Sequence, residues 1–324
     1  MHYDIVATLG PISDTPSVWE RMLAAGVTAF RLNTSHLSRS HLQEWIDRLG
    51  LFLATRNPRP PLILDLQGSK WRLGQFPARE LVPGARVTLV CERSAVGPDL
   101  LPVPHTDFFR AASVSSGEIV LDDAKLRLVI ESQEAGGLQA RVITGGPILP
   151  RKGITYAAST YRQESLSDTD RAILGDTKLV EGVRYALSYV KDAAEMRNYR
   201  RETGQAPYLI AKLERQPALD EAMQIAGSAE ELWLCRGDLG AELGAAAMAD
   251  AVYRFSERVG TLPVPVLLAG QVFEHMTEHA TPTRSEVCEV YAALMKDYHG
   301  FVLSDETAIG RNPVESCRMA ALFR

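Results

Sequence analysis

The chain has 324 residues, of which 46% are hydrophobic, so it can bury one large core or a core plus a smaller domain. Its formal net charge of −5 gives no sign of a nucleic-acid or membrane partner, and no apolar run approaches the length of a membrane span. The opening residues do not form a signal peptide, and the four cysteines are widely spaced without a CxxC pair. We therefore expect reduced thiols in a cytoplasmic protein.

Strand-like runs alternate with helical patterns over most of the chain. The predicted strands cover 3–10, 28–36, 61–69, 183–190, 206–214, 231–240, 264–272 and 300–308. Helical patterns follow them at 17–26, 41–56, 166–182, 193–204, 218–227, 245–260, 283–297 and 312–324. Eight βα units require a parallel sheet and predict a closed (β/α)8 TIM barrel of the α/β class. An open doubly wound sheet is the alternative, but no GxGxxG follows the first strand.

A different pattern interrupts the barrel signal between Leu73 and Gly153. Four β-like runs, at 85–92, 117–123, 125–132 and 138–146, are separated by Gly, Pro and polar turns. We therefore predict a barrel built from 1–72 and 154–324, with a small all-β lid domain at 73–153 inserted after the third strand. Loops after barrel strands lie on the face where active sites form, so this insertion is placed to close over a site.

Charged and polar residues gather where the predicted strands end. Because strand side chains alternate between faces, residues two apart share a face. The residues concerned are Arg31, Asn33 and Ser35; Asp65; Lys212 and Glu214; Arg236 and Asp238; and Ser304 and Glu306. If these faces point inward, the carboxylates suit Mg²⁺ or Mn²⁺ and the cations suit an anionic substrate. For any single pair, an ion pair at the barrel mouth, or a strand-end charge exposed to water, is the better interpretation, whereas the whole set on one face favours a functional site.

Long stretches of the chain resemble the pyruvate kinase family. Residues 4–36 are similar to its opening strand, TxGP turn, helix and RLNxSH strand, and LILDLQGSKWR (62–72) is similar to its third strand. EIVLDDAKLRLVI (118–130) and LPRKGI (149–154) resemble landmarks of its lid. AKLERQ (211–216) and CRGDLGAEL (235–243) resemble its KIEN and ARGDLGVE segments. PVLLAGQVFEHM (265–276), PTRSEV (282–287) and VLSDETAIGRNPVES (302–316) resemble the blocks that close its barrel.

The resemblance implies phosphoryl transfer between phosphoenolpyruvate and ADP through an enolate. It places Lys212 beside the transferred phosphoryl group and the enolate oxygen, Arg31 on the phosphoryl group, and Ser304 in the proton path to the enolate carbon. It also implies that Mg²⁺ or Mn²⁺ binds to Glu214 and Asp238. Metal and cations around a bound anion agree with the interpretation from the residues alone.

The resemblance further implies sites for a monovalent cation, the substrate carboxylate and the nucleotide. The K⁺ site would use Asn33, Ser35, Asp65 and the main-chain carbonyl of Leu66. The substrate carboxylate would meet the backbone N–H groups of Gly237 and Asp238, with Arg236 and Gly270 nearby. The nucleotide residues would be His36, Arg72 and, from the lid, Lys152.

Several positions depart from the family pattern. Gly270 replaces a threonine of the family's ATQM segment that helps to hold the carboxylate, and Leu37 replaces a glycine near the nucleotide entrance. Gln67 replaces a lysine, and Lys70 replaces an acidic residue. The sequence stops at Arg324, so the C-terminal domain that carries much of the family's allosteric control and tetramer contact is not expected. A homodimer through the barrel helices is the remaining expectation.

Three hypotheses follow. The first is a metal-dependent phosphotransferase acting on phosphoenolpyruvate and ADP. The second keeps the metal and the enolate but uses no nucleotide, as a lyase, aldolase or decarboxylase acting on a 2-oxo acid, because the departures lie on the substrate and nucleotide sides. The third is a non-catalytic paralogue that binds a metabolite and signals through a partner, against which the intact lysine and carboxylates argue.

Overall fold

The computed structural model describes residues 1–68, 71–112, 118–122, 125–134, 136–156 and 166–324. The chain divides into two compact units. One, which we call the barrel unit, comprises 1–68, 165–236 and 250–324. The other, the second unit, comprises 69–164 and 237–249.

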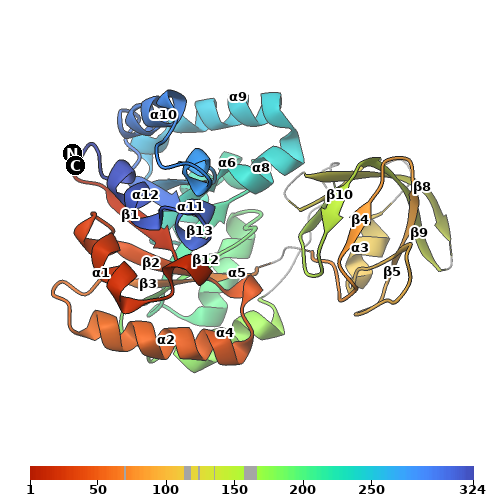
Figure 1. The fold of residues 1–324 in the computed structure, drawn as a ribbon, viewed down its shortest axis with the longest axis horizontal. Helices are drawn as coiled ribbons and strands as arrows, with labels where there is room; N and C mark the ends of the chain where they lie inside the picture. The colour runs from red at the N-terminus through yellow and green to blue at the C-terminus, as the bar shows by residue number, and fades with distance from the viewer. Residues whose placement is uncertain (69–70, 113–117, 123–124, 135, 157–165) are drawn as a thin grey trace. The chain divides into compact units, whose positions relative to one another are not determined.

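The barrel unit is a closed barrel of eight parallel strands, which confirms the predicted (β/α)8 fold (Figure 1). Around the barrel the strands are β1 (Asp4–Thr8), β16 (Gly300–Leu303), β15 (Val266–Ala269), β14 (Glu231–Cys235), β13 (Tyr208–Leu213), β12 (Val183–Leu187), β3 (Leu62–Leu66) and β2 (Ala29–Asn33). Nearly every strand residue is buried, as expected for parallel strands covered by helices on one face and packed together on the other.

Helices follow the strands, as the sequence pattern predicts. They are α1 (Pro16–Ala24), α2 (Arg39–Ala54), α4 (Asp168–Thr177), α5 (Ala193–Thr203), α6 (Gln216–Asp220), α7 (Ala222–Ala226), α8 (Arg236–Leu243), α9 (Ala245–Ser256), α10 (Arg284–Leu294), α11 (Asp305–Ala308) and α12 (Pro313–Ala320). Side-chain caps fix several starts: Ser167 accepts from the Asp170 N–H at α4, and Thr283 forms a capping box with Glu286 at α10. The chain ends meet where the Met1 amino group donates to the Phe323 carbonyl.

Every barrel strand ends before its predicted range does, and after β2, β14 and β16 this makes part of the alternation argument wrong. The 3₁₀ turn η2 (Thr34–His36) follows β2, α8 begins directly after β14, and α11 follows β16. Ser35 is therefore not on a strand face with Arg31 and Asn33. The same correction applies to two further pairs, Arg236 with Asp238 and Ser304 with Glu306.

Local hydrogen bonds explain two of these early ends. The Asn33 side chain accepts from the Ser35 N–H, and the Glu306 carboxylate accepts from the Ser304 N–H. Such side-chain to backbone bonds satisfy main-chain groups within a turn and compete with continuation of the strand.

The second unit has its own β-sheets and its own core. A six-stranded sheet has the order β11 (Ile154–Tyr156), β7 (Glu118–Leu121), β8 (Leu126–Glu134), β9 (Gly137–Thr144), β5 (Arg86–Val90) and β6 (Leu100–Pro102). A smaller sheet pairs β10 (Gly146–Ile148) with β4 (Arg79–Leu81), and α3 (Thr106–Ala111) packs into the core. Trp71 belongs to this core and donates to Asp107. The role of this unit as a lid stays a prediction.

An apolar layer fills the inside of the barrel with at least one side chain from each strand. Its members are Val6, Ala29, Ile63, Ala186, Ile210, Trp233, Cys235, Leu267, Ala269 and Val302. The barrel is thus a packed core rather than a pore. Side chains two residues further along each strand must also project inward, nearer the carboxyl ends, and they form the floor of the candidate site.

Candidate active site

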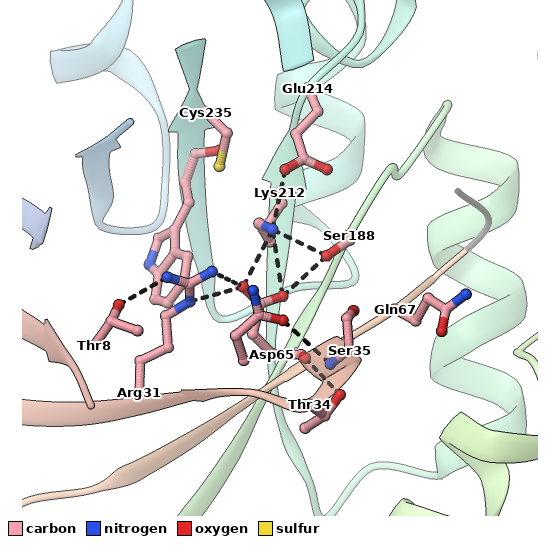
Figure 2. A network of polar contacts seen from close by, with 12 residues as sticks. Thr8, Arg31, Thr34, Ser35, Asp65, Gln67, Ser188, Lys212, Glu214 and Cys235 are labelled. Carbon is pink, nitrogen blue, oxygen red and sulfur yellow. Dashed lines mark hydrogen bonds and ion pairs between the residues drawn. The ribbon is translucent and has the colours of Figure 1, made fainter. Parts of the chain in front are cut away.

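The layer above the apolar core is largely polar. Counting two residues onward gives Thr8, Arg31, Asp65, Ser188, Lys212, Cys235, Ala269 and Ser304. Ser188 and Ser304 follow directly after their strands, and Cys235 and Ala269 also belong to the apolar layer. Figure 2 shows Thr8, Arg31, Asp65, Ser188 and Lys212 joined by polar contacts at the ends of β1, β2, β3, β12 and β13. Parallel strands therefore bring together residues that lie far apart in the sequence.

Asp65 is the centre of this network. Its Oδ2 accepts from Arg31 Nε at 2.7 Å and pairs with Arg31 Nη2 at 2.5 Å, while Oδ1 accepts from Ser188 Oγ at 2.9 Å. Arg31 Nη1 donates to Thr8 Oγ1 at 2.7 Å, which fixes the guanidinium from its other side. Burial alone would raise the pKa of Asp65, but the charges of Lys212 and Arg31 hold it below its usual value.

The Lys212 ammonium is buried and points into the barrel mouth. It contacts both oxygens of Asp65 at 3.2 and 3.3 Å, donates to Ser188 Oγ at 2.9 Å, and pairs with Glu214 Oε1 at 3.0 Å (Figure 2). Burial opposes the charged form, but the carboxylates of Asp65 and Glu214 outweigh it and raise the pKa of Lys212. The lysine is therefore a fixed cation at neutral pH, which disfavours Schiff-base chemistry.

Glu214 follows β13 and is also buried. Its Oε1 faces Lys212, and its Oε2 accepts from the backbone N–H of Tyr189 at 2.6 Å. Tyr189 adopts a left-handed backbone conformation with φ +63°, which is uncommon for a residue other than glycine. Two independent contacts therefore orient this carboxylate.

Cys235 lies beside Lys212 and Glu214 in Figure 2 but is poorly suited to be a nucleophile. Burial, followed by the charge of Glu214, raises the pKa of its thiol well above the usual value. The thiol is thus protonated and serves as core packing.

The residues predicted for a monovalent cation lie around the ends of β2 and β3. Asn33 Oδ1 accepts from the Ser35 N–H, and the hydroxyl of Thr34 donates to the Asp65 carbonyl. Their amide, hydroxyl and main-chain oxygens, with the Leu66 carbonyl, suit K⁺. Both carboxylate oxygens of Asp65, however, already accept from the lysine, the arginine and the serine. A K⁺ site would therefore have to depend mainly on the neutral oxygens.

Arg236 holds the loop after β15. Its Nε and Nη2 donate to the Gly270 carbonyl at 3.0 and 2.6 Å, Nη2 also donates to the Gln271 carbonyl, and Nη1 pairs with Glu289. This arrangement makes the guanidinium a loop anchor rather than a group that faces a substrate. Gly270 has φ +85°, a conformation that strains a threonine.

Ser304 occupies the N-cap position of the short helix α11 without a side-chain capping bond, and its N–H donates to Glu306 Oε2 at 2.8 Å. Glu306 is fully buried and also accepts from the Phe273 N–H. Burial raises the pKa of Glu306 to about 7. It is a buried structural acid next to the predicted proton path, not a charge that lines the mouth.

The remaining predicted residues belong to the second unit or are not described. Arg72 forms a bridge with Gly153, and Lys152 pairs with Asp122 at 2.8 Å. Gly237 and Asp238 lie in the first turn of α8. The side chain of His36 and all of Lys70 fall outside the described residues. The roles proposed for these residues stay predictions.

The donor chemistry of the barrel unit suits a hard divalent cation. Mg²⁺ typically binds one or two carboxylates and completes its shell with water and substrate oxygens. Glu214 supplies one oriented carboxylate of the barrel unit, whereas the other predicted ligand, Asp238, belongs to the second unit and its role stays a prediction. Within the described residues, no three His, Cys, Asp or Glu side chains are grouped to hold a metal by themselves.

Four residues of the network were not anticipated from the sequence: Thr8, Thr34, Ser188 and Tyr189. A signal for two of them exists, since Thr8 and Ser188 each lie two residues beyond an inward apolar residue, Val6 and Ala186. The contribution of Tyr189 is a backbone N–H in a left-handed turn, for which the sequence offers no sign.

Among the described helices, none is long and apolar enough to cross a membrane. A family model described as pyruvate kinase, barrel domain, matches residues 1–317. A pyruvate kinase of Methylorubrum extorquens is 32% identical and covers 96% of this chain and 66% of its own length. Pyruvate kinase 2 of Synechocystis sp. and pyruvate kinase of Aeropyrum pernix are each 31% identical. They match 98% of this chain, which spans 55% and 69% of their lengths.

Proposed function

From the premise that this chain belongs to the pyruvate kinase family, we propose that it transfers a phosphoryl group between phosphoenolpyruvate and ADP. The observation that carries the proposal is the Lys212 ammonium, held in the barrel mouth between the carboxylates of Asp65 and Glu214. A fixed cation beside an oriented carboxylate is the arrangement that phosphoryl transfer and enolate chemistry require.

In the proposed reaction, a terminal phosphate oxygen of ADP attacks the phosphorus of phosphoenolpyruvate. The bond between phosphorus and the enol oxygen breaks, and its electron pair passes to the enolate, whose carbon then takes a proton to give pyruvate. Lys212 would stabilise the negative charge that develops on the enol oxygen, with the substrate replacing Glu214 Oε1 as its partner. Hydrogen-bond donors that are already in position stabilise a developing negative charge more strongly in a site that excludes water than in bulk water.

Arg31 is suited to bind the phosphoryl group. A guanidinium has five N–H donors, and three of them are used by Asp65 and Thr8 within the described residues. The other two N–H groups are available for an anion, and the bonds to Asp65 and Thr8 fix the orientation of the guanidinium. Ser304, directly after β16, is proposed to lie in the path of the proton that reaches the enolate carbon.

Glu214 and Asp238 would hold Mg²⁺ or Mn²⁺, which when bound neutralises charge on substrate oxygens. The neutral oxygens of Asn33, Ser35 and Leu66 are proposed for K⁺. We also propose that Gly237 and Asp238 bind the substrate carboxylate through their N–H groups, and that His36, Arg72 and Lys152 contact the nucleotide.

A coupled assay with phosphoenolpyruvate, ADP, Mg²⁺ and K⁺ tests the proposal. The wild-type protein should produce pyruvate, and Lys212→Met should lower kcat by about 10²- to 10³-fold, the usual effect of removing one electrostatic stabiliser. No turnover by the wild type above that of Lys212→Met contradicts the proposal.

Gly270 supports a second candidate, a nucleotide-independent decarboxylase or aldolase acting on a 2-oxo acid. The positive φ of Gly270 is unfavourable for the threonine that the family has at this position. The Gly270 carbonyl accepts from Arg236, which holds the loop after β15 in this conformation. Metal-dependent loss of CO₂ from oxaloacetate, equally fast with and without ADP, together with no phosphoryl transfer, favours this candidate.

A further inference from the structure

We propose that Ser188 and Tyr189, the two residues after β12, form a turn that positions Lys212 and Glu214, with Ser188 holding the ammonium and the Tyr189 N–H holding the carboxylate. We call these two residues the positioning turn. The inference deepens the proposed function, since it names the residues that prepare its cation and its carboxylate. Both are buried and belong to the barrel unit.

The hydroxyl of Ser188 has a defined direction. Lys212 Nζ lies 2.9 Å from Ser188 Oγ and can only donate, because an ammonium has no acceptor. The serine hydrogen therefore points to Asp65 Oδ1, also at 2.9 Å. Ser188 is thus an acceptor for the cation and a donor to the anion.

This bridge keeps Lys212 in place independently of Glu214. The ammonium has three hydrogens, and its partners are Asp65, Ser188 and Glu214. When a substrate oxygen takes the position of Glu214 Oε1, Asp65 and Ser188 still hold the nitrogen on two sides. Without the serine hydroxyl, a buried N–H of the lysine and a lone pair of Asp65 lose their partner, a loss that is large for charged groups.

Tyr189 holds the other partner through its backbone. Its φ of +63° turns the N–H toward Glu214 Oε2 at 2.6 Å, which leaves Oε1 on the side of Lys212. A non-glycine residue persists in this conformation only when its surroundings impose it, and such strain gathers at functional sites. Here the Arg215 guanidinium lies 4.4 Å from the centre of the tyrosine ring and helps to fix it.

The residues that directly follow β3 pack against the positioning turn. Gly68 packs so closely that a Cβ there would lie 2.0 Å from the Ser188 carbonyl oxygen. The buried carboxylate of Asp170 accepts from the N–H groups of Gln67 and Gly68, which holds this exit in place. The turn is therefore confined between β3 and the charged cluster.

The first test compares Ser188→Ala with Ser316→Ala. Ser316 is a fully buried serine on α12 whose hydroxyl contacts backbone carbonyls. Ser188→Ala should lower kcat by about 10- to 100-fold and leave KM for phosphoenolpyruvate within about 2-fold, as expected when a supporting hydrogen bond to a catalytic group is lost. Ser316→Ala should leave kcat unchanged at a comparable loss in Tm. Equal kcat in the two variants overturns the role of Ser188.

The second test isolates the backbone of Tyr189 and needs no turnover. Tyr189→Val and Tyr189→Asn both remove the ring, but only asparagine tolerates positive φ readily. The affinity of each protein for Mn²⁺ alone is measured by electron paramagnetic resonance. Tyr189→Val should bind Mn²⁺ about 10-fold more weakly than Tyr189→Asn, as for a lost outer contact of a metal ligand. Equal affinities of the two variants overturn the role of the turn.

The two tests separate this inference from the proposed function. If the wild type does not convert phosphoenolpyruvate, the proposed function fails. The Ser188 comparison is then made on the binding of oxalate, a planar dianion shaped like an enolate, in the presence of Mn²⁺ by calorimetry. A loss of oxalate affinity confined to Ser188→Ala still supports the positioning turn, and its absence still contradicts it.

Discussion

At the scale of single residues, the barrel mouth is a balance of buried charges. Arg31 and Lys212 supply two cations, and Asp65 and Glu214 supply two carboxylates, all within hydrogen-bonding reach of a neighbour of opposite sign. Removing one partner from such a pair leaves a buried charge uncompensated, which costs far more than the pair itself contributes. The effect of each substitution can therefore be argued from the partner it leaves behind.

Asp65→Asn should be strongly destabilising. The amide leaves two buried cations facing one carboxylate, so we expect the free energy of unfolding to fall by about 3 to 5 kcal/mol at pH 7. Because the pKa of Asp65 is lowered in the folded state, its contribution is present above its unfolded pKa and is lost as the pH falls below about 4. Urea unfolding at pH 7 and pH 3 measures this. A difference between variant and wild type that does not shrink at pH 3 contradicts the assignment.

Glu306→Gln should show the opposite pH dependence. The pKa of Glu306 is raised to about 7, so the folded state binds its proton more tightly than the unfolded state. The wild type should therefore lose stability as the pH rises from about 4.5 to 7, by an amount on the order of 3 kcal/mol. A glutamine cannot titrate, so the stability of the variant relative to wild type should improve between pH 5 and pH 8 in chemical denaturation. A constant difference would mean that Glu306 is ionised throughout.

At the scale of elements, the strand ends decide the site. β2, β14 and β16 stop at Asn33, Cys235 and Leu303, and the chain turns at once into short helices. The alternation rule holds within each strand, but it does not extend into the turns and helices that begin soon after the strand ends. Just after β3, Gly68 packs against the Ser188 carbonyl so closely that a Cβ would lie 2.0 Å from its oxygen.

Gly68→Ala tests that approach. The residue has φ +62°, and an added Cβ meets the Ser188 carbonyl oxygen at 2.0 Å. We expect a loss of about 3 kcal/mol in the free energy of unfolding, from backbone strain together with overpacking. Gly182→Ala is the matched control, since Gly182 has φ +78° and a Cβ there would meet only the flexible Arg59 side chain, at 3.4 Å. It should cost only about 1 kcal/mol. Similar losses in the two variants would show that the close contact is unimportant.

At the scale of the whole molecule, each of the two units has a hydrophobic cluster of its own among the described residues. One fills the barrel, and the other lies inside the second unit around Trp71 and Phe108. Units with separate cores can unfold independently, so a single two-state transition is not assured. Tryptophan reports on the two units separately, because Trp71 lies in the second unit and the other three tryptophans lie in the barrel unit.

Trp71→Phe should therefore change the fluorescence-detected unfolding curve. In the wild type, fluorescence should follow both units, whereas in the variant it follows the barrel unit alone. We expect the fluorescence and far-ultraviolet circular dichroism curves of the variant to separate in urea. Coincident curves in wild type and variant would instead indicate one cooperative unit.

The sequence by itself determined the barrel and the residues at its mouth. Eight apolar runs, each followed by a helical pattern, favour a closed parallel sheet over an open one, and Arg31, Asp65, Lys212 and Glu214 meet because parallel strands end on one side. Local patterns were sufficient to predict these features because the strand period and the βα alternation both depend on residues that are close together in the sequence.

Only the tertiary structure decided how these groups are held. Asp65 accepts a hydrogen bond from Ser188, which lies 123 positions away in the chain. The Tyr189 N–H donates to Glu214 because Tyr189 has a positive φ, which its residue type does not predict. The redirection of Arg236 to loop carbonyls and the burial of Glu306 likewise depend on contacts between distant segments. Local sequence fixes which face a strand residue occupies, whereas the partner that meets it there depends on the closed barrel.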